Sequence, residues 1–200
     1  MIYFTSVYED EPTHQVMLRL YDYFHGCFGE LKTIPCNGKG KIKRQLKAYY
    51  NAAQYSHYFI ITDLDISYNC APSLIRDWLP KHSARNFLFR IAVHEIESWL
   101  LADRENFASF FFVNKALVPL YPDNETDPKQ TIINIAKKSR KRAIREDIIP
   151  IDQYAKTGPG YNIQLQNYIQ HTWNINSARR NSQSLNKAIK SLEKIASHPA

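Results

Sequence analysis

The chain has 200 residues, of which 44% are hydrophobic and 22% are charged, with 6 glycines and 10 prolines. This composition excludes an intrinsically disordered chain, and the length suits one well-buried domain better than two. Lysine and arginine outnumber aspartate and glutamate by 26 to 19, giving a formal net charge of +7, which favours an anionic partner.

The N-terminus and the cysteines predict a cytoplasmic protein. Residues 1–7 lack the basic region, apolar run and cleavage site of a secretory signal, so export is not expected. Polar and charged residues interrupt each apolar stretch before the roughly 18 residues that a membrane helix requires, so no membrane span is expected. Cys27, Cys36 and Cys70 are odd in number and lack zinc-site spacing, which favours free thiols in a reducing compartment.

The first half of the chain alternates between predicted strands and helices. Residues 1–8 are rich in β-branched and aromatic side chains and run into the acidic turn Glu9-Asp10-Glu11-Pro12, which predicts a strand. A helix is predicted from Thr13, its expected N-cap, to the region before Gly26. Residues 31–34 predict a short second strand, and residues 41–54 predict a second helix.

The alternation continues through the middle of the chain. Residues 58–62 form a nearly continuous apolar run, typical of a parallel strand covered on both faces, and end in Asp63-Leu64-Asp65. A helix is predicted from Pro72 to Leu79, and residues 86–93 predict a fourth strand that leads into His94-Glu95-Ile96-Glu97. Further helices are predicted over 98–112, near 129–146 and over 182–196.

Strands that alternate with helices imply βα units joined by right-handed crossovers. We therefore predict an α/β fold of Rossmann type, with a mostly parallel sheet flanked by helices over residues 1–112. Residues 113–200 are predicted to form a helical, basic C-terminal extension packed on this core, within a single domain overall.

Acidic residues follow three of the predicted strands, where parallel sheets bind their ligands. They are Glu9 with Asp10 and Glu11, Asp63 with Asp65, and Glu95 with Glu97. Gathering carboxylates is unfavourable unless a cation or bound protons neutralise them, and Mg²⁺ or Mn²⁺ suits oxygen ligands better than zinc does. The alternative interpretation is that each acidic residue caps the helix that follows it.

A divalent ion at these strand ends could orient water and stabilise charge on a transferring phosphoryl group. The metal ligands expected on this basis are Glu9, Asp63, Asp65, Glu95 and Glu97. The residues expected to be catalytic are Glu9, Asp63, Asp65 and Glu97, with Glu9 as a ligand or general base and either Glu95 or Glu97 as an accessory group.

Two blocks of basic residues could contact a phosphate backbone. The first contains Lys39, Lys41, Lys43, Arg44 and Lys47. The denser second block contains Lys137, Lys138, Arg140, Lys141, Arg142 and Arg145. We predict that the second block, as part of a basic helix, binds nucleic acid; the alternative is a helix face that only contacts water.

Several segments of the chain resemble a family of small Toprim-like bacterial proteins. The similarity lies in Val7-Tyr8-Glu9-Asp10-Glu11, in Ile61-Thr62-Asp63-Leu64-Asp65 through Arg76, and in the stretch from Glu95 to Asp103. It continues in Asp127-Pro128-Lys129, the stretch from Arg145 to Pro150, Gly158-Pro159-Gly160-Tyr161-Asn162 and Ser182-Gln183-Ser184-Leu185. The resemblance therefore covers nearly the whole chain.

This resemblance implies a Toprim-like fold, the catalytic module of topoisomerases, primases and overcoming-lysogenization-defect nucleases. Glu9, Asp63 and Asp65 match the metal-site positions of that module. Two positions depart from its usual motifs, because Asp10 replaces the glycine after the first glutamate and Leu64 replaces the glycine between the two aspartates.

Two functions are consistent with these features. The first is a Mg²⁺-dependent nuclease or phosphodiesterase acting on nucleic acid, and the resemblance implies a role in phage defence or mobile-element biology. The second is a non-catalytic nucleic-acid-binding protein, or a subunit that acts with an ATPase partner protein. The chain contains no Walker A loop of its own.

Overall fold

A computed structural model describes residues 1–64, 68–79, 84 and 86–197. Contacts within the chain divide it into two compact units. The first unit comprises Met1–Val93 and Lys187–Ala200, and the second comprises His94–Asn186. This division falls after residue 93, whereas the predicted α/β core ends at residue 112.

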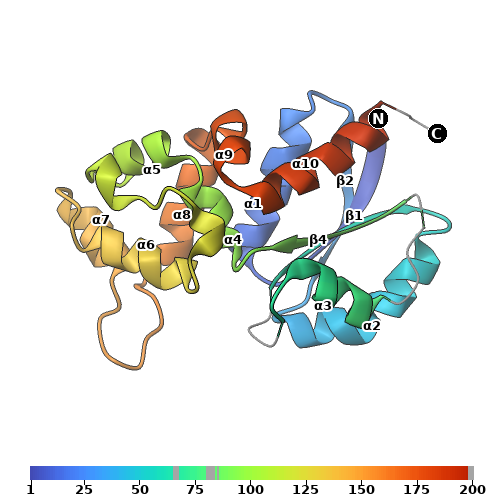
Figure 1. Ribbon diagram of the computed structural model, residues 1–200, viewed down its shortest axis with the longest axis horizontal. Helices are drawn as coiled ribbons and strands as arrows, with labels where there is room; N and C mark the ends of the chain where they lie inside the picture. Colours follow the sequence, from blue (N-terminus) through green and yellow to red (C-terminus); the bar gives the residue numbers. More distant parts are fainter. Residues whose placement is uncertain (65–67, 80–83, 85, 198–200) are drawn as a thin grey trace. The chain divides into compact units, whose positions relative to one another are not determined.

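The first unit contains a four-stranded, all-parallel sheet, which confirms the predicted α/β fold (Figure 1). Its strands are β1 (Ile2–Tyr8), β2 (Phe28–Pro35), β3 (His57–Asp63) and β4 (Phe87–Ala92), in the spatial order β2-β1-β3-β4. β2 is longer than the four residues predicted. Pairing with β1, which begins at Ile2 opposite Phe28, extends it beyond the residues whose local composition favours a strand.

Helices cover both faces of this sheet. They are α1 (Glu11–Tyr23), α2 (Lys39–Ala52), α3 (Ala71–Trp78) and, from Lys187 onward, α10 (Gln183–Ala196). Because the chain moves from β1 to β2 on one side and then crosses back to β3 on the other, right-handed crossovers place α1 and α2 on opposite faces. Figure 1 shows α1 with α10 on one face and α2 with α3 on the other.

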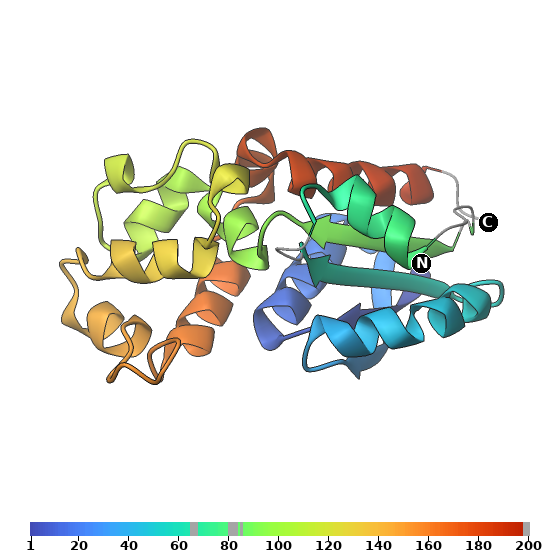
Figure 2. The ribbon, with the colours of Figure 1, turned by 60° about the horizontal axis from the view of Figure 1, so that its bottom comes forward.

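The two faces of the sheet carry separate clusters of buried side chains. Facing α2 and α3, Val7 and Ile60 pack with Leu46 in an apolar cluster. On the opposite face, the Phe4 and Tyr21 rings stack with centroids 5.7 Å apart. α10 runs along β4 (Figure 2), where the Arg90 guanidinium donates to the Ser191 hydroxyl. Side chains are therefore packed against both faces of the sheet.

The regular secondary structure described in the second unit is all helical. Its α-helices are α4 (Ile96–Leu101), α5 (Arg104–Phe110), α6 (Pro128–Ala136), α7 (Arg142–Ile148), α8 (Tyr161–His171) and α9 (Ile175–Asn181). Two short 3-10 helices, η1 (Lys115–Leu117) and η2 (Pro122–Asn124), precede α6. Every residue of α4 is buried, and the indole of Trp173 donates to the Trp99 carbonyl at 3.2 Å. α4 is therefore the core of this unit.

Two of the predicted helices are each divided in the structure. The helix predicted over 98–112 is α4 and α5, because the buried Asp103 carboxylate interrupts it and accepts from the backbone amide of Asn174 at 2.7 Å. The helix predicted near 129–146 is α6 and α7. Between them, the buried Ser139 hydroxyl donates to the Phe111 carbonyl at 2.6 Å and holds the turn in place.

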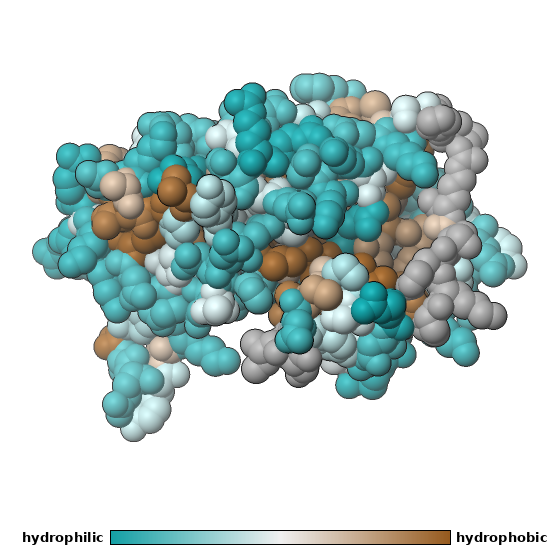
Figure 3. Space-filling model, viewed as in Figure 1, coloured by the Kyte–Doolittle hydropathy of each residue, from teal (hydrophilic) through white to brown (hydrophobic). Residues whose placement is uncertain are grey.

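The face drawn in Figure 3 is mainly hydrophilic, with hydrophobic side chains gathered in a few patches. Most of the large apolar side chains described belong to the buried clusters of the two units. Exposed aromatic side chains include Phe112 and Tyr154 of the second unit. Among the residues described, no helix is both long enough and apolar enough to cross a membrane.

Candidate functional site

The strand order of the first unit creates a ligand-binding position between β1 and β3. From β1 the chain continues to β2 on one side and later returns to β3 on the other, so the direction of winding reverses here. In open parallel sheets, ligands bind in the crevice outside the strand ends at this reversal. Glu9 follows β1 directly, and Asp63 is the last residue of β3. Two of the predicted site residues therefore lie at this position.

The Glu9 carboxylate is hydrogen-bonded to the end of β3. Its Oε1 atom accepts from the Thr62 hydroxyl and from the backbone amide of Asp63, the latter at 3.1 Å. Thr62 is buried, whereas Glu9 and Asp63 are half-buried. The contact joins residues more than fifty positions apart, and it orients the first acidic residue against the second.

Burial raises the pKa of the Glu9 carboxyl group above its usual value. The hydrogen bonds from Thr62 and the Asp63 amide oppose this shift, and so does the positive charge of Lys39. The nearby Asp10 carboxylate adds to the rise. The ionised form of Glu9 is thus destabilised, so that a cation bound beside it would be favoured.

Asp10 has a structural role, as the capping alternative proposed. Its Oδ1 atom accepts from the backbone amide of Thr13 at 3.1 Å and from the Thr13 hydroxyl at 2.6 Å. Asp10, rather than the predicted Thr13, is thus the N-cap of α1. Asp63 cannot cap the next helix in the same way, because α3 begins only at Ala71 and its N-cap is Cys70.

Leu64, which follows Asp63, is part of the sheet and of its apolar core. Its backbone amide donates to the Ala92 carbonyl at 2.9 Å and so continues the pairing of β3 with β4. Its side chain is 4% exposed and belongs to the apolar cluster beneath α2 and α3. The predicted ligand Asp65 lies outside the described residues.

Glu95 and Glu97 belong to the second unit, where Lys129 contacts both of them. Glu97 is fully buried, and its Oε1 atom accepts from the Tyr161 hydroxyl at 3.0 Å and lies 3.4 Å from the Lys129 ammonium. Glu95 is partly exposed and accepts from the backbone amide of Lys129 at 2.9 Å. Of the two glutamates, Glu97 is the one that points into the core.

Lys129 and Tyr161 were not predicted as site residues. They lie 32 and 64 positions beyond Glu97, and neither spacing nor composition connects them to it. Their only signal was that both fall in segments that carry the family resemblance. Tyr161 follows Gly158-Pro159-Gly160, and a Cβ atom at Gly158 would lie 2.3 Å from the Asp147 carbonyl oxygen, so the glycine permits this close packing.

Carboxylate groups at the end of the sheet could serve as oxygen ligands for a divalent cation. Glu9 and Asp63 stand at the same edge, where the Asp63 amide donates to Glu9 and burial raises the pKa of the Glu9 carboxyl group. Such donors fit Mg²⁺ or Mn²⁺. In the described part of the chain, no three histidine, cysteine, aspartate or glutamate side chains form a metal-binding group.

The second basic block lies at the corner between α6 and α7 and not within one helix. Lys137, Lys138, Arg140 and Lys141 are exposed there. Arg142 pairs with Glu146 at 2.6 Å, and Arg145 donates to the Ser139 carbonyl. In the first block, Lys43 pairs with Asp77 at 2.8 Å. The corner therefore concentrates positive charge that internal ion pairs only partly offset.

The fold of the first unit is of the Rossmann-like α/β class, with an all-parallel sheet and its strand-order reversal between β1 and β3. The chain matches no protein-family model, no curated protein and no solved structure.

Proposed function

We propose that the chain is a Mg²⁺- or Mn²⁺-dependent phosphodiesterase that acts on nucleic acid, in the manner of Toprim-type nucleases. The observation that carries this proposal is the Glu9 carboxylate, which lies at the strand-order reversal and is hydrogen-bonded to the end of β3. Glu9 and Asp63, together with Asp65 from the sequence motif, would hold the ion. The ion would polarise the phosphate and activate water.

The protein groups around Glu9 have two tasks in this proposal. The Thr62 hydroxyl and the Asp63 amide fix one carboxylate oxygen and thereby orient the side chain. Burial raises the pKa of Glu9, so its ionised form gains from a neighbouring cation and, without one, can accept a proton more readily. Glu9 is therefore assigned as a metal ligand or general base.

Glu95 and Glu97 receive a smaller role than the sequence analysis predicted. Lys129 already supplies a positive charge to both, and Tyr161 donates to Glu97. A buried carboxylate with these partners stabilises the second unit without requiring a metal. Their accessory role at the metal stays a prediction.

The test is a cleavage assay with single- and double-stranded DNA and RNA, with Mg²⁺, Mn²⁺ or EDTA. Wild-type protein is compared with Glu9→Gln and Asp63→Asn, which keep side-chain size and remove the charge. Asp22→Asn is the matched control, because Asp22 is an exposed aspartate of α1. We expect metal-dependent cleavage by the wild type and the control, and at least about a hundredfold loss in both site variants.

Cleavage that persists in Glu9→Gln and Asp63→Asn would contradict this site assignment. Thermal unfolding of each variant separates loss of chemistry from loss of folding. Calorimetric titration with Mn²⁺ supplies a readout that is independent of cleavage, and we expect heat of binding for the wild type and Asp22→Asn only.

A second candidate is a non-catalytic nucleic-acid-binding protein, alone or with an ATPase partner. The exposed cations at the corner between α6 and α7 favour this role, because phosphate contacts need only positive charge. Nucleic-acid binding without cleavage, unchanged in Glu9→Gln, would support it over the nuclease. The family resemblance is the basis for proposing either function in phage defence or mobile-element biology.

A further inference from the structure

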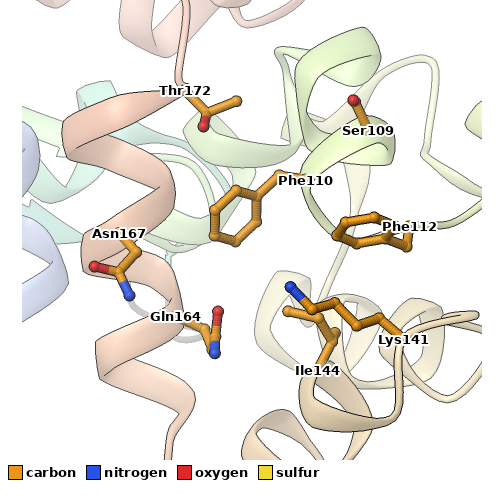
Figure 4. A pocket seen from close by; sticks show the side chains of 8 residues that line it. All are labelled: Ser109, Phe110, Phe112, Lys141, Ile144, Gln164, Asn167 and Thr172. Carbon is orange, nitrogen blue, oxygen red and sulfur yellow. The ribbon is translucent and has the colours of Figure 1, made fainter.

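A pocket of about 520 Å³ lies in the second unit between the end of α5, the start of α7 and the middle of α8 (Figure 4). This volume is within the range of small-ligand sites. Its lining combines two aromatic rings, Phe110 and Phe112, with the Lys141 ammonium and the side-chain amides of Gln164 and Asn167. The pocket is distinct from the acidic residues of the proposed metal site.

Phe112 is held in an unusual backbone conformation. Its φ angle is +54°, in the left-handed region that bulky residues rarely adopt, while its side chain stays 42% exposed. The backbone is held from the basic corner, because the Arg140 amide donates to the Phe112 carbonyl at 3.1 Å. The fold thus maintains an exposed aromatic ring at a position where local energetics oppose it.

Lys141 lines the pocket and also belongs to the basic block at the corner between α6 and α7. Its ammonium lies 4.9 Å from the centroid of the Phe112 ring, a cation–π contact. Figure 4 shows the side chain extending beneath this ring toward α8. Among the described residues, no carboxylate forms an ion pair with Lys141. Lys138 and Arg140, both exposed, extend the positive charge beyond the pocket.

The two amides on α8 supply hydrogen-bonding groups on the opposite side. The Gln164 amide nitrogen donates to the Asp147 carboxylate. This contact leaves the Gln164 side-chain carbonyl oxygen directed toward the pocket (Figure 4). Asn167, one turn farther along α8, is exposed and offers both a donor and an acceptor. Gln164 and Asn167 thus add hydrogen-bonding groups, of the kind that a nucleic-acid base edge could contact, to the lining of the pocket.

We propose that this pocket binds one unpaired base of a single-stranded nucleic acid. The base stacks on Phe112 beside Phe110, its edge contacts Gln164 and Asn167, and the adjoining phosphates contact the basic corner. Stacking on aromatic side chains together with a positively charged surface is how proteins bind single strands. The inference deepens the proposed function by naming unpaired strands as the ligand, and it rests on that function for the assignment of nucleic acid.

The test measures binding without cleavage, using fluorescence anisotropy of a labelled twelve-nucleotide single strand and its duplex in EDTA. Phe112→Ala should weaken single-strand binding about tenfold, the loss of one stacked base, and leave duplex binding unchanged. Phe112→Trp should retain single-strand binding, because it keeps an aromatic ring at the same position. Tyr154→Ala is the matched control, since Tyr154 is an exposed aromatic residue of the same unit that does not line the pocket.

Single-strand binding by Phe112→Ala equal to that of the wild type would overturn the inference, and so would an equal loss for strand and duplex. A mononucleotide that competes as well as the oligonucleotide would also overturn it, in favour of a small-molecule site. The result is separable from the proposed nuclease: cleavage that depends on Glu9 with no effect of Phe112→Ala removes only this inference. Phe112-dependent binding without any cleavage removes only the nuclease.

Discussion

At the scale of single residues, burial and hydrogen bonding act on Glu9 in opposite directions. Removal from water favours its protonated form, whereas the Thr62 hydroxyl and the Asp63 amide favour the carboxylate. Burial has the larger effect, so the pKa of Glu9 is raised in the folded state. The folded protein consequently binds a proton at Glu9 more tightly than the unfolded chain does.

This difference makes the stability of the protein depend on pH. Below the pKa that Glu9 has in the unfolded chain, its carboxyl group is protonated in both the folded and the unfolded state. As the pH rises through the higher pKa that Glu9 has in the folded state, the group loses its proton, and the stability that came from tighter proton binding is lost. We expect Glu9→Gln to be more stable than the wild type at pH 8, with a difference that shrinks toward pH 4. Urea unfolding across this range measures it, and a difference independent of pH would contradict the explanation.

Glu97 illustrates a buried charge that depends on its partner. It is fully buried, and the Lys129 ammonium lies 3.4 Å away. Removing Lys129 leaves the buried Glu97 carboxylate with less compensation, so Lys129→Met should lower the free energy of unfolding by about 2 kcal/mol, less than for a fully buried pair because Lys129 is partly exposed. Lys115→Met, which breaks the exposed pair with Glu105, should cost less than about 0.5 kcal/mol.

The Lys129 comparison is made by urea unfolding followed by tryptophan fluorescence, because Trp99 and Trp173 are buried in the same unit. Adding Glu97→Gln to Lys129→Met should recover part of the loss, since the uncompensated charge is then removed. Equal costs for Lys129→Met and Lys115→Met would show that the buried pair does not stabilise the unit.

At the scale of elements, α7 and α8 are joined through a tight glycine contact. A Cβ atom at Gly158 would lie 2.3 Å from the Asp147 carbonyl oxygen and 2.6 Å from the Ile148 carbonyl carbon. Both are backbone atoms of the α7 end, which cannot move aside as a flexible side chain could. Gly158 therefore allows the chain to return along α7 and place Tyr161 beside Glu97.

Substitution of this glycine should be far costlier than that of a glycine with free space. We expect Gly158→Ala to lower the free energy of unfolding by about 3 kcal/mol through overpacking. Gly40→Ala, in α2, should instead raise it by about 0.5 kcal/mol, because the nearest neighbour of its Cβ is the Arg44 side chain at 3.7 Å. Urea unfolding of both variants tests the contrast, and similar effects would contradict it.

Several element boundaries follow from local sequence, and others do not. The run before Asp63 is apolar and β-branched, so the strand is evident from its own residues. The division between α6 and α7 depends on Ser139, whose partner Phe111 is 28 positions away. Because no local pattern encodes that contact, the basic residues around it are predicted as one helix although they form a corner.

At the scale of the whole molecule, the formal net charge of +7 favours an anionic partner. Each basic block contains an ion pair, Lys43 with Asp77 in the first and Arg142 with Glu146 in the second. The second block has more basic residues, and Lys138 and Arg140 are exposed at the corner between α6 and α7. We therefore expect Lys138 and Arg140 to make phosphate contacts.

Salt dependence of nucleic-acid affinity measures these contacts. We expect the logarithm of the duplex affinity to fall linearly with the logarithm of salt concentration, and Lys138→Ala with Arg140→Ala should reduce the slope by about 2. Lys43→Ala, whose charge is already paired, should change the slope by much less. Anisotropy titrations over a series of salt concentrations provide the slopes, and equal changes for both blocks would contradict the assignment.

Local periodicity and general rules of chain crossover were enough to predict the alternation of strands and helices, the parallel sheet and the position of acidic residues after its strands. The contacts of Glu9 with Thr62 and Asp63, and the burial of Glu97 rather than Glu95 in a core with Lys129 and Tyr161, depend instead on the tertiary structure. Each of these contacts joins polar groups that lie far apart in the sequence. Such groups are brought together only by the packing of the folded chain, so local sequence patterns do not predict them.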